Sequence, residues 1–324
     1  MMTNPAPRVV ALAAVVPALL AAGCTMPAGQ REEGATRAAA RPPAAAGAST
    51  ARKSSAEAGQ NNGQGHLCPA GANVLACRLA NYGEFQGAAW THLPSIGIKY
   101  VFMNVPPPDQ LEATTKRLAR HGLTAAVLRG DTDLSKASCI DELALQLETC
   151  SRMGVRFMFL SAKRRGADKQ VVYHRLRQAG DIAAKHEVTI ALETHPDLAT
   201  NGDVALETMK QINHPNVRMN FDTANIHYYN RNTDAPTELK KIINYVATVE
   251  LKDHNGRYKA WDFPALGRGV VDIPQVLRIL EKHGYSGPLT IEVEGIKGVQ
   301  MDEAETKAYI AESAAYVRSL GEFR

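Results

Sequence analysis

Hydrophobic and polar positions alternate with two different periods along most of this chain. Short apolar segments with a two-residue period, typical of strands, are separated by longer segments with the spacing of amphipathic helices. Strands are expected at 73–79, 98–104, 123–128, 155–161, 187–193, 216–222, 246–252 and 288–293. Helices are expected at 84–94, 109–121, 138–153, 168–186, 203–213, 235–245, 273–283 and 302–319. Parallel strands need such crossovers, and eight strand–helix pairs predict a single (β/α)₈ TIM barrel.

An open, doubly wound sheet is the alternative fold for this order of elements. Both faces of such a sheet lie under helices, so a polar strand face would be buried there. Several strands in the second half of the chain have one polar face. In a barrel the helices cover only the outer face, and a polar face points into the mouth. The pattern therefore favours a barrel, which we assign to residues 69–324.

Four of the predicted strands place an acidic residue near the C-terminal end of their polar face. Successive side chains of a strand point to opposite faces, so each acid lies opposite the aliphatic positions of its strand. Active sites of (β/α)₈ barrels lie at the C-terminal ends of the strands. We therefore expect four carboxylates to converge at the barrel mouth: Glu193, Asp222, Glu250 and Glu292.

Converging carboxylates repel each other and are costly to desolvate unless a cation lies among them. The sequence therefore predicts a metal site. Oxygen ligands favour Mg²⁺ or Mn²⁺, with Zn²⁺ as a further possibility. Four carboxylates exceed the charge of one divalent ion by two, and Lys252, His195 or His254 are candidates to compensate.

The N-terminal region has the pattern of a targeting segment. Arg8 precedes an apolar run, from Val9 to Ala22, that is too short to cross a bilayer core of about 30 Å. Small residues then lead to Cys24, which resembles the lipidation site of a bacterial lipoprotein. The alternative is an ordinary secretory signal that is cut near Ala22. We expect residues 1–23 to be a lipoprotein signal peptide.

A low-complexity segment follows at residues 24–68, rich in Ala, Gly, Pro and Ser and without an apolar period. Such a composition cannot offset the entropy cost of ordering, so we expect a flexible tether. The predicted location is therefore outside the cytoplasm, on a membrane through a lipid anchor. The net charge of +4 is spread along the chain, which argues against nucleic acid as a partner.

Five short motifs of the second half resemble the xylose isomerase-like TIM barrels, a family of sugar phosphate isomerases and epimerases, inosose dehydratase and endonuclease IV. The motifs are Ala-Leu-Glu-Thr-His-Pro at 191–196, Asn-Phe-Asp-Thr-Ala-Asn at 220–225, Leu-Lys-Asp-His at 251–254, Leu-Gly-Arg-Gly-Val-Val-Asp at 266–272 and Gly-Tyr-Ser-Gly-Pro-Leu-Thr-Ile-Glu at 284–292.

The resemblance implies a metal bound by side chains of strands five to eight, with Glu193, Asp222 and Glu292 as its core ligands. Glu250 stands where the family commonly has a His, so the fourth ligand is open between Glu250, His254 and His227. Asn225 also stands at a position where the family commonly has a His.

Proton transfer beside a carbonyl is the chemistry that such a site would perform. We expect Glu193, Glu292, Lys252 and His195 to be catalytic, and His195, His227, Asn225 and Arg268 to contact a carbohydrate substrate. Structural alternatives stay open: Glu193 and Glu292 as salt-bridged rim residues, Asp222 as a loop cap, Glu250 as a partner of Lys252, His195 as a satisfied loop histidine, and Arg268 as a loop residue.

Three functions remain open at this point. The first is a metal-dependent sugar isomerase or epimerase that acts through an enediolate. The second is a lyase or dehydratase on a 3-keto-glycoside or an inosose, which proceeds through the same enolate. The third is a non-catalytic sugar-binding lipoprotein, motivated by Glu250 in place of the usual His. Export and too few histidines for a trinuclear zinc site argue against a nuclease.

Overall fold

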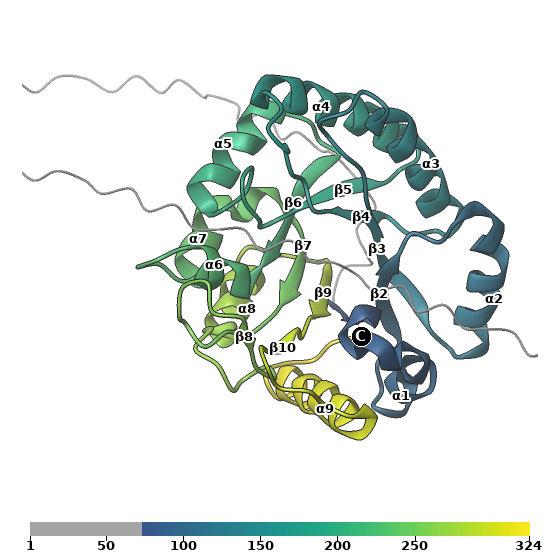
Figure 1. Cartoon of the computed structure of the whole chain (residues 1–324), viewed down its shortest axis with the longest axis vertical. Coiled ribbons are helices and arrows are strands. Elements are labelled where there is room, and N and C mark those ends of the chain that lie inside the picture. The colour runs from purple at the N-terminus through teal and green to yellow at the C-terminus, as the bar shows by residue number, and fades with distance from the viewer. Residues whose placement is uncertain (1–72) are drawn as a thin grey trace, which may run out of the picture. The chain divides into compact units, whose positions relative to one another are not determined.

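The computed structural model describes residues 73–324, which form a closed parallel barrel (Figure 1). Its strands, in barrel order, are β1 (Val74–Arg78), β2 (Tyr100–Asn104), β3 (Thr124–Gly130), β4 (Phe157–Leu160), β5 (Thr189–Glu193), β6 (Val217–Asp222), β7 (Val246–Leu251) and β9 (Pro288–Ile291). β9 pairs in parallel with both β7 and β1, which closes the cylinder. All eight predicted strands are confirmed, and the open-sheet alternative is excluded.

Helices cover the outside of the barrel, as the alternating pattern predicts (Figure 1). They are α1 (Ala89–Ser95), preceded by the 3₁₀ segment η1 (Leu79–Ala88), α2 (Leu111–Arg120), α3 (Cys139–Arg152), α4 (Lys169–Lys185), α5 (Gly202–Ile212), α7 (Ala235–Ile242), α8 (Ile273–Lys282) and α9 (Glu303–Ser319). None of the helices within residues 73–324 is both long and apolar enough to span a bilayer.

Two features of the mouth were not predicted. A short helix, α6 (Thr223–Tyr229), begins directly after β6, and the Asp222 carboxylate accepts hydrogen bonds from the first backbone N–H groups of this helix. A small antiparallel sheet joins β8 (Asp262–Phe263) to β10 (Gly295–Ile296). Strands of two residues have no period to detect, so the hydrophobic pattern contains no signal for them.

The interior of the barrel is divided between an apolar and a polar half. Phe102, Val127, Phe157 and Phe159 from β2, β3 and β4 pack together with Ala247. Across the barrel, the inward positions of β6 and β7 carry a hydrogen-bonded polar pair, in which the Thr248 hydroxyl donates to the Asn220 amide oxygen at 2.6 Å. The polar half lies under the mouth where the acids were expected.

The expected signal peptide, Cys24 and the tether lie outside the described residues. The export and lipid anchor of the chain therefore stay predictions from the sequence.

Candidate active site

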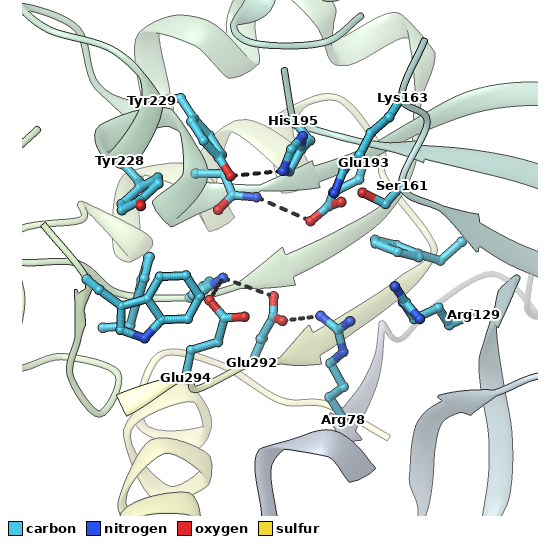
Figure 2. A pocket seen from close by; sticks show the side chains of 15 residues that line it. Arg78, Arg129, Ser161, Lys163, Glu193, His195, Tyr228, Tyr229, Glu292 and Glu294 are labelled. Carbon is cyan, nitrogen blue, oxygen red and sulfur yellow. Dashed lines mark hydrogen bonds and ion pairs between the residues drawn. The ribbon is translucent and has the colours of Figure 1, made fainter. Parts of the chain in front are cut away.

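A cavity of about 240 Å³ opens at the C-terminal mouth of the barrel. Glu193, Lys252 and Glu292 line it, together with Glu294, which follows β9. In Figure 2, Glu193 lies on one side of the cavity, and Glu292 and Glu294 lie on the other. The structure thus brings the polar ends of β5, β7 and β9 to one pocket.

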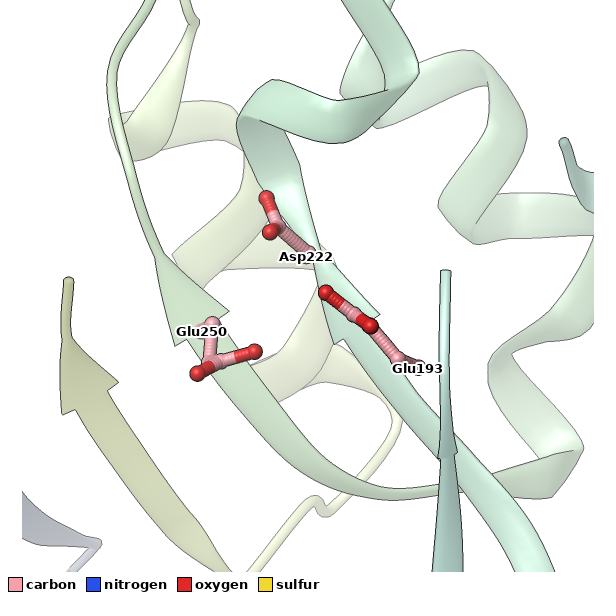
Figure 3. Close-up of side chains that lie close together, drawn as sticks. All are labelled: Glu193, Asp222 and Glu250. Atoms are coloured by element: carbon pink, nitrogen blue, oxygen red, sulfur yellow. The ribbon is translucent and has the colours of Figure 1, made fainter. Parts of the chain in front are cut away.

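Three carboxylates form a compact group at the mouth of the barrel, in which Glu193 lines the pocket and Asp222 and Glu250 are fully buried. One oxygen each of Glu193, Asp222 and Glu250 lies within 4.8 Å of the other two (Figure 3). The sequence places Glu292 rather than Glu250 in the core of the metal site. The structure groups Glu250 with Glu193 and Asp222 instead, and Glu292 lies between Arg78 and Lys252.

Of the two carboxylate oxygens of Asp222, one accepts hydrogen bonds and the other accepts none from the described residues. Oδ1 accepts hydrogen bonds from the backbone N–H groups of Ala224 and Asn225, at 2.9 and 3.0 Å, at the start of α6. Oδ2 is buried without a hydrogen-bond partner among the described residues and lies 3.6 Å from the Lys252 Nζ. Burial, only partly offset by Lys252, raises the pKa of Asp222 to about 7. One oxygen is therefore free to bind a cation.

Glu250 is completely buried and hydrogen-bonded through both oxygens. The Arg78 guanidinium donates to Oε1 at 3.1 Å, and the Asn220 amide donates to Oε2 at 2.8 Å. Burial, reinforced by the neighbouring Glu292 charge, raises its pKa well above the usual range. The acid at the position where the family commonly has a His thus shares Arg78 with Glu292 and is held by Asn220.

Glu292 is held between two cations. Arg78 donates to its Oε1, and the Lys252 ammonium lies 3.5 Å from its Oε2. Burial alone would raise the pKa of Glu292, but Lys252 and Arg78 outweigh it and the pKa is lowered. Glu292 is therefore ionised at neutral pH and able to accept a proton.

Lys252 is the most heavily paired cation of the pocket. Its Nζ lies 2.6 Å from Glu294 and within ion-pair distance of both Asp222 and Glu292. It also lies over the face of the Phe263 ring, 4.4 Å from the centroid. Burial opposes its charge, but Glu292, Asp222 and Glu294 raise the pKa of Lys252 well above the usual range. Lys252 therefore stays protonated.

His195 and Asn225 both line the cavity, where the sequence places substrate contacts. The His195 Nδ1 lies 2.5 Å from the Pro196 carbonyl oxygen, and its Nε2 lies 2.9 Å from the Tyr229 hydroxyl. The carbonyl requires a donor, so Nδ1 is protonated and Nε2 accepts from Tyr229. Asn225 donates to Glu193 at 3.3 Å and to the Thr194 carbonyl at 2.9 Å, which orients the Glu193 carboxylate.

Three other predicted residues do not line the cavity. The His254 Nδ1 accepts from the Gly256 N–H, and Nε2 donates to the Ala260 carbonyl, so neither ring nitrogen is free for a metal. His227 is half-buried in α6 near the His254 ring. Arg268 instead forms a two-pronged ion pair with Glu312 on α9. In this geometry these residues support the loops around the pocket.

Several pocket residues escaped the sequence analysis. Arg78 lies at the inward-facing end of β1, and its position in the strand was the available signal, because it corresponds to that of the acids at the ends of the later strands. Arg129, Ser161 and Lys163 also line the cavity, at or after the ends of β3 and β4. Aromatic rings complete the cavity: Tyr228, Tyr229, Trp261 and Phe263.

The residues present fit a hard divalent cation. Glu193, Asp222 and Glu250 supply only oxygen donors, which suits Mg²⁺ or Mn²⁺. The buried Asp222 Oδ2 and Glu292 Oε2 accept no hydrogen bond from the described residues, although both lie near Lys252. Five carboxyl groups, those of Glu193, Asp222, Glu250, Glu292 and Glu294, lie near two paired cations, Arg78 and Lys252, so a divalent ion would offset the charge that Asp222 and Glu250 carry once deprotonated.

Comparison with known proteins agrees with this architecture. The curated inosose dehydratase of Histophilus somni (strain 129Pt) is 24% identical over 170 residues, which cover 48% of this chain and 56% of that protein. The match thus extends over little more than half of the length of that relative.

Solved structures show the same fold at low sequence identity. A xylose isomerase domain protein from Planctomyces limnophilus is 22% identical, with a TM-score of 0.62 over 77% of this chain and 98% of that one. D-psicose 3-epimerase from Clostridium cellulolyticum H10, solved with D-tagatose, is 14% identical, with a TM-score of 0.63 over 77% and 99%. A Mycobacterium smegmatis barrel solved in complex with magnesium is 16% identical, with a TM-score of 0.62 over 77% and 96%.

The family match itself spans most of the barrel. Residues 87–320 match the xylose isomerase-like TIM barrel family, which confirms the resemblance that the five motifs indicate. The chain therefore belongs to the xylose isomerase-like TIM barrel family.

Proposed function

We propose that this protein is a metal-dependent isomerase or epimerase of a sugar or sugar derivative. The observation that carries the proposal is the placement of Glu193 and Glu292 on opposite sides of one pocket (Figure 2), with Glu193 also part of a compact group of carboxylates. Two acids on opposite sides of a sugar are suited to remove a proton from carbon and to return one. The epimerase among the structural neighbours supports the same class.

The residues of the chain divide this work. Glu292, which is ionised at neutral pH, accepts a proton from the carbon beside the carbonyl. Glu193, held by Asn225, exchanges a proton on the other side of the substrate. Tyr228 and Trp261 supply aromatic faces for the sugar ring. A divalent ion held by Glu193, Asp222 and Glu250 would polarise the substrate oxygens and so favour loss of the proton.

Deuterium exchange tests this function. Protein loaded with Mn²⁺ is incubated in D₂O with a panel of free sugars, 3-keto sugars and inososes, and deuterium at carbon is measured. We expect incorporation with at least one substrate, and a loss of about 10²-fold or more in Glu193→Gln and Glu292→Gln. Glu281→Gln, which alters an exposed acid on α8, is the matched control. Full activity in either pocket variant would refute the proposal.

A lyase or dehydratase is the second candidate, and a second cavity supports it. This cavity of about 300 Å³ shares Arg78, Trp261, Glu292 and Glu294 with the first and extends toward Met301 and Tyr309. It offers space for the aglycone or second ring of a glycoside. The similarity to an inosose dehydratase favours the same reaction class. Release of the aglycone or of water from a 3-keto-glycoside or inosose would identify the lyase. Absence of both metal binding and exchange would identify a sugar-binding protein.

We also propose that the protein is exported and lipidated at Cys24, as the N-terminal pattern predicts. Replacement Cys24→Ala removes the thiol that would carry the lipid, so we expect the variant to leave the membrane fraction. Fractionation of expressing cells measures this directly. Membrane association of the variant equal to that of the wild type would rule out the anchor.

A further inference from the structure

The wall of the pocket formed by β3 and β4 carries positive charge. Arg129 near the end of β3, Ser161 directly after β4 and Lys163 two residues later all line the cavity. In Figure 2 they lie on the side of the pocket away from Glu294. The carboxylates come instead from β5, β6, β7 and the segment after β9. In Figure 2 Glu193 lies beside this wall, so the wall adds positive charge to a pocket whose carboxylates lie on several sides.

The two cations on this wall have no acidic partner. Arg129 and Lys163 form no ion pair within residues 73–324, and the Arg129 Nε is buried without a hydrogen-bond partner there. The chain neighbours of Lys163 differ, because Arg164 is paired with Asp197 and Arg165 with Asp133. Arg129 and Lys163 thus differ from Arg164 and Arg165 in facing the cavity without an acidic partner among the described residues.

Acids behind Arg129 do not remove this charge. A groove on the outer side of Arg129 contains Asp131 and Glu142. The Glu142 carboxylate already accepts hydrogen bonds from Thr132 and Ser138, at 2.6 and 3.0 Å. Neither acid lies within ion-pair distance of Arg129. The Arg129 guanidinium is therefore not neutralised by either acid, and its side chain lines the cavity.

Charge counting leads to the same side of the pocket. Arg78 forms ion pairs with Glu250 and Glu292. Lys252 forms ion pairs with Asp222, Glu292 and Glu294. With Arg129 and Lys163 included, four cations face five carboxylates, counting Glu193. A divalent ion bound by Glu193, Asp222 and Glu250 would change the net charge of these groups from −1 to +1. The cations without an acidic partner among the described residues are the two on the β3–β4 wall. A neutral sugar would leave that charge unpaired.

We propose that Arg129, Lys163 and Ser161 form an anion subsite that holds a carboxylate or phosphate group of the substrate. The planar guanidinium of Arg129 presents parallel donors, Lys163 adds a mobile charge, and the Ser161 hydroxyl is a further donor. The subsite rests on the proposed function and narrows its substrate to a sugar acid or a sugar phosphate. It directs the anionic end of the substrate to β3 and β4 and the reacting carbon toward Glu193 and Glu292.

Binding measurements on the metal-loaded full chain test the subsite without any turnover. The probes are D-glucose, D-glucuronate and D-glucose 6-phosphate, so that the neutral ring is compared with a carboxylate and a phosphate. We expect at least one anionic probe to bind about tenfold or more tightly than glucose. The advantage should shrink as salt concentration rises, because the Lys163 end of the subsite is exposed. The preferred anionic probe identifies the source of the charge.

Variants locate the effect. Lys163→Gln changes an exposed side chain and leaves folding intact, and Arg129→Gln removes the partly buried charge. Both variants should reduce the affinity of the anionic probes relative to glucose without weakening the binding of glucose itself. Arg129→Lys should retain part of the affinity that Arg129→Gln loses. Lys185→Gln, at the end of α4 and outside the cavity, is the matched control. Equal binding of all three probes, or an advantage unchanged in the Arg129→Gln/Lys163→Gln double variant, would overturn the subsite.

The two proposals fail in distinguishable ways. Loss of anion selectivity in the variants, without deuterium exchange on any substrate, would uphold the subsite and reject the isomerase. Deuterium exchange on a neutral sugar at a rate that the two variants do not change would uphold the isomerase and reject the subsite.

Discussion

Arg78 supplies a buried positive charge that links two acids of the barrel mouth. Its guanidinium binds both Glu250 and Glu292, and its carbon Cζ lies 4.8 Å from the centre of the Phe102 ring. Glu250 is fully buried and has only one other donor, Asn220. The ion pairs are therefore part of the folded core as well as of the pocket.

Loss of Arg78 should destabilise the protein strongly. Arg78→Met leaves Glu250 and Glu292 without this partner, and breaking a buried pair typically costs about 3–5 kcal/mol. Arg268→Met is the matched control, because Arg268 pairs with Glu312 on the surface, where loss costs about 0–1 kcal/mol. Urea unfolding of both variants measures the difference. Adding Glu250→Gln to Arg78→Met should recover part of the loss; equal destabilisation by the two single variants would contradict the assignment.

Single residues of the site were predictable where strand period alone decides their direction. Glu193, Asp222, Glu250 and Glu292 all point into the mouth, as alternation requires. Their partners were not predictable, because the pairing of Arg78 with Glu250 joins residues 172 positions apart. Such a contact depends on which strands are neighbours after the barrel closes, and local sequence does not contain that information.

The loop after β7 shows how an element positions the site. Asp253 accepts hydrogen bonds from the backbone N–H groups of His254, Gly267, Gly269 and Val271. One carboxylate thus holds the Leu-Gly-Arg-Gly-Val motif against the end of β7. The motif that the sequence analysis connects with substrate through Arg268 is explained here by its backbone, which folds around Asp253.

A methyl group at Gly269 should disturb this loop. A Cβ there would lie 2.1 Å from the Asp253 Oδ1 and 2.5 Å from the His254 carbonyl oxygen, so Gly269→Ala forces these groups apart. We expect a loss of about 1–3 kcal/mol in the free energy of unfolding. Gly87→Ala, where nothing lies within 4 Å of the new Cβ, is the control and should be near neutral. Similar melting temperatures for both variants would contradict the role of the loop.

Helices and strands were predictable from the sequence where they are long enough to show a repeating hydrophobic pattern. Each long helix and each barrel strand lies within a few residues of its expected range, because burial on one face dictates a repeating pattern. The predicted helix at 235–245 ends early as α7 and continues as a 3₁₀ turn over Ile243–Tyr245. The short helix α6 has no such pattern, and its start depends on the Asp222 cap.

At the scale of the whole molecule, the barrel concentrates acidic charge at one end of its axis. The apolar side chains of the interior come mainly from β2, β3 and β4, whereas β6 and β7, which carry acids of the mouth, also supply the polar pair Asn220 and Thr248. Folding therefore carries an electrostatic cost at the mouth that a proton or a metal ion can reduce. The stability of the entire barrel should respond to both.

In the metal-free protein, stability should fall as pH rises toward neutrality. The pKa of Asp222 is raised from its ordinary value of 3.8 to about 7 by burial, and the pKa of Glu250 is raised as well. Between these values the folded state retains protons that the unfolded state loses, so stability contributed by these groups is present at low pH and lost as pH increases. Glu292, with its lowered pKa, opposes this trend in the acid range.

A divalent ion should reverse the trend, because it replaces the protons that Asp222 and Glu250 otherwise keep. Mn²⁺ at about 100 times its dissociation constant should add about 2.7 kcal/mol to the free energy of unfolding near pH 8, and much less near pH 5. Thermal melts with and without Mn²⁺ across this range measure the effect. Asp222→Asn should lose most of the pH dependence and of the Mn²⁺ response together. If Mn²⁺ stabilises the wild type equally at both pH values, protons and metal do not compete for the same carboxylates, and the metal site lies elsewhere.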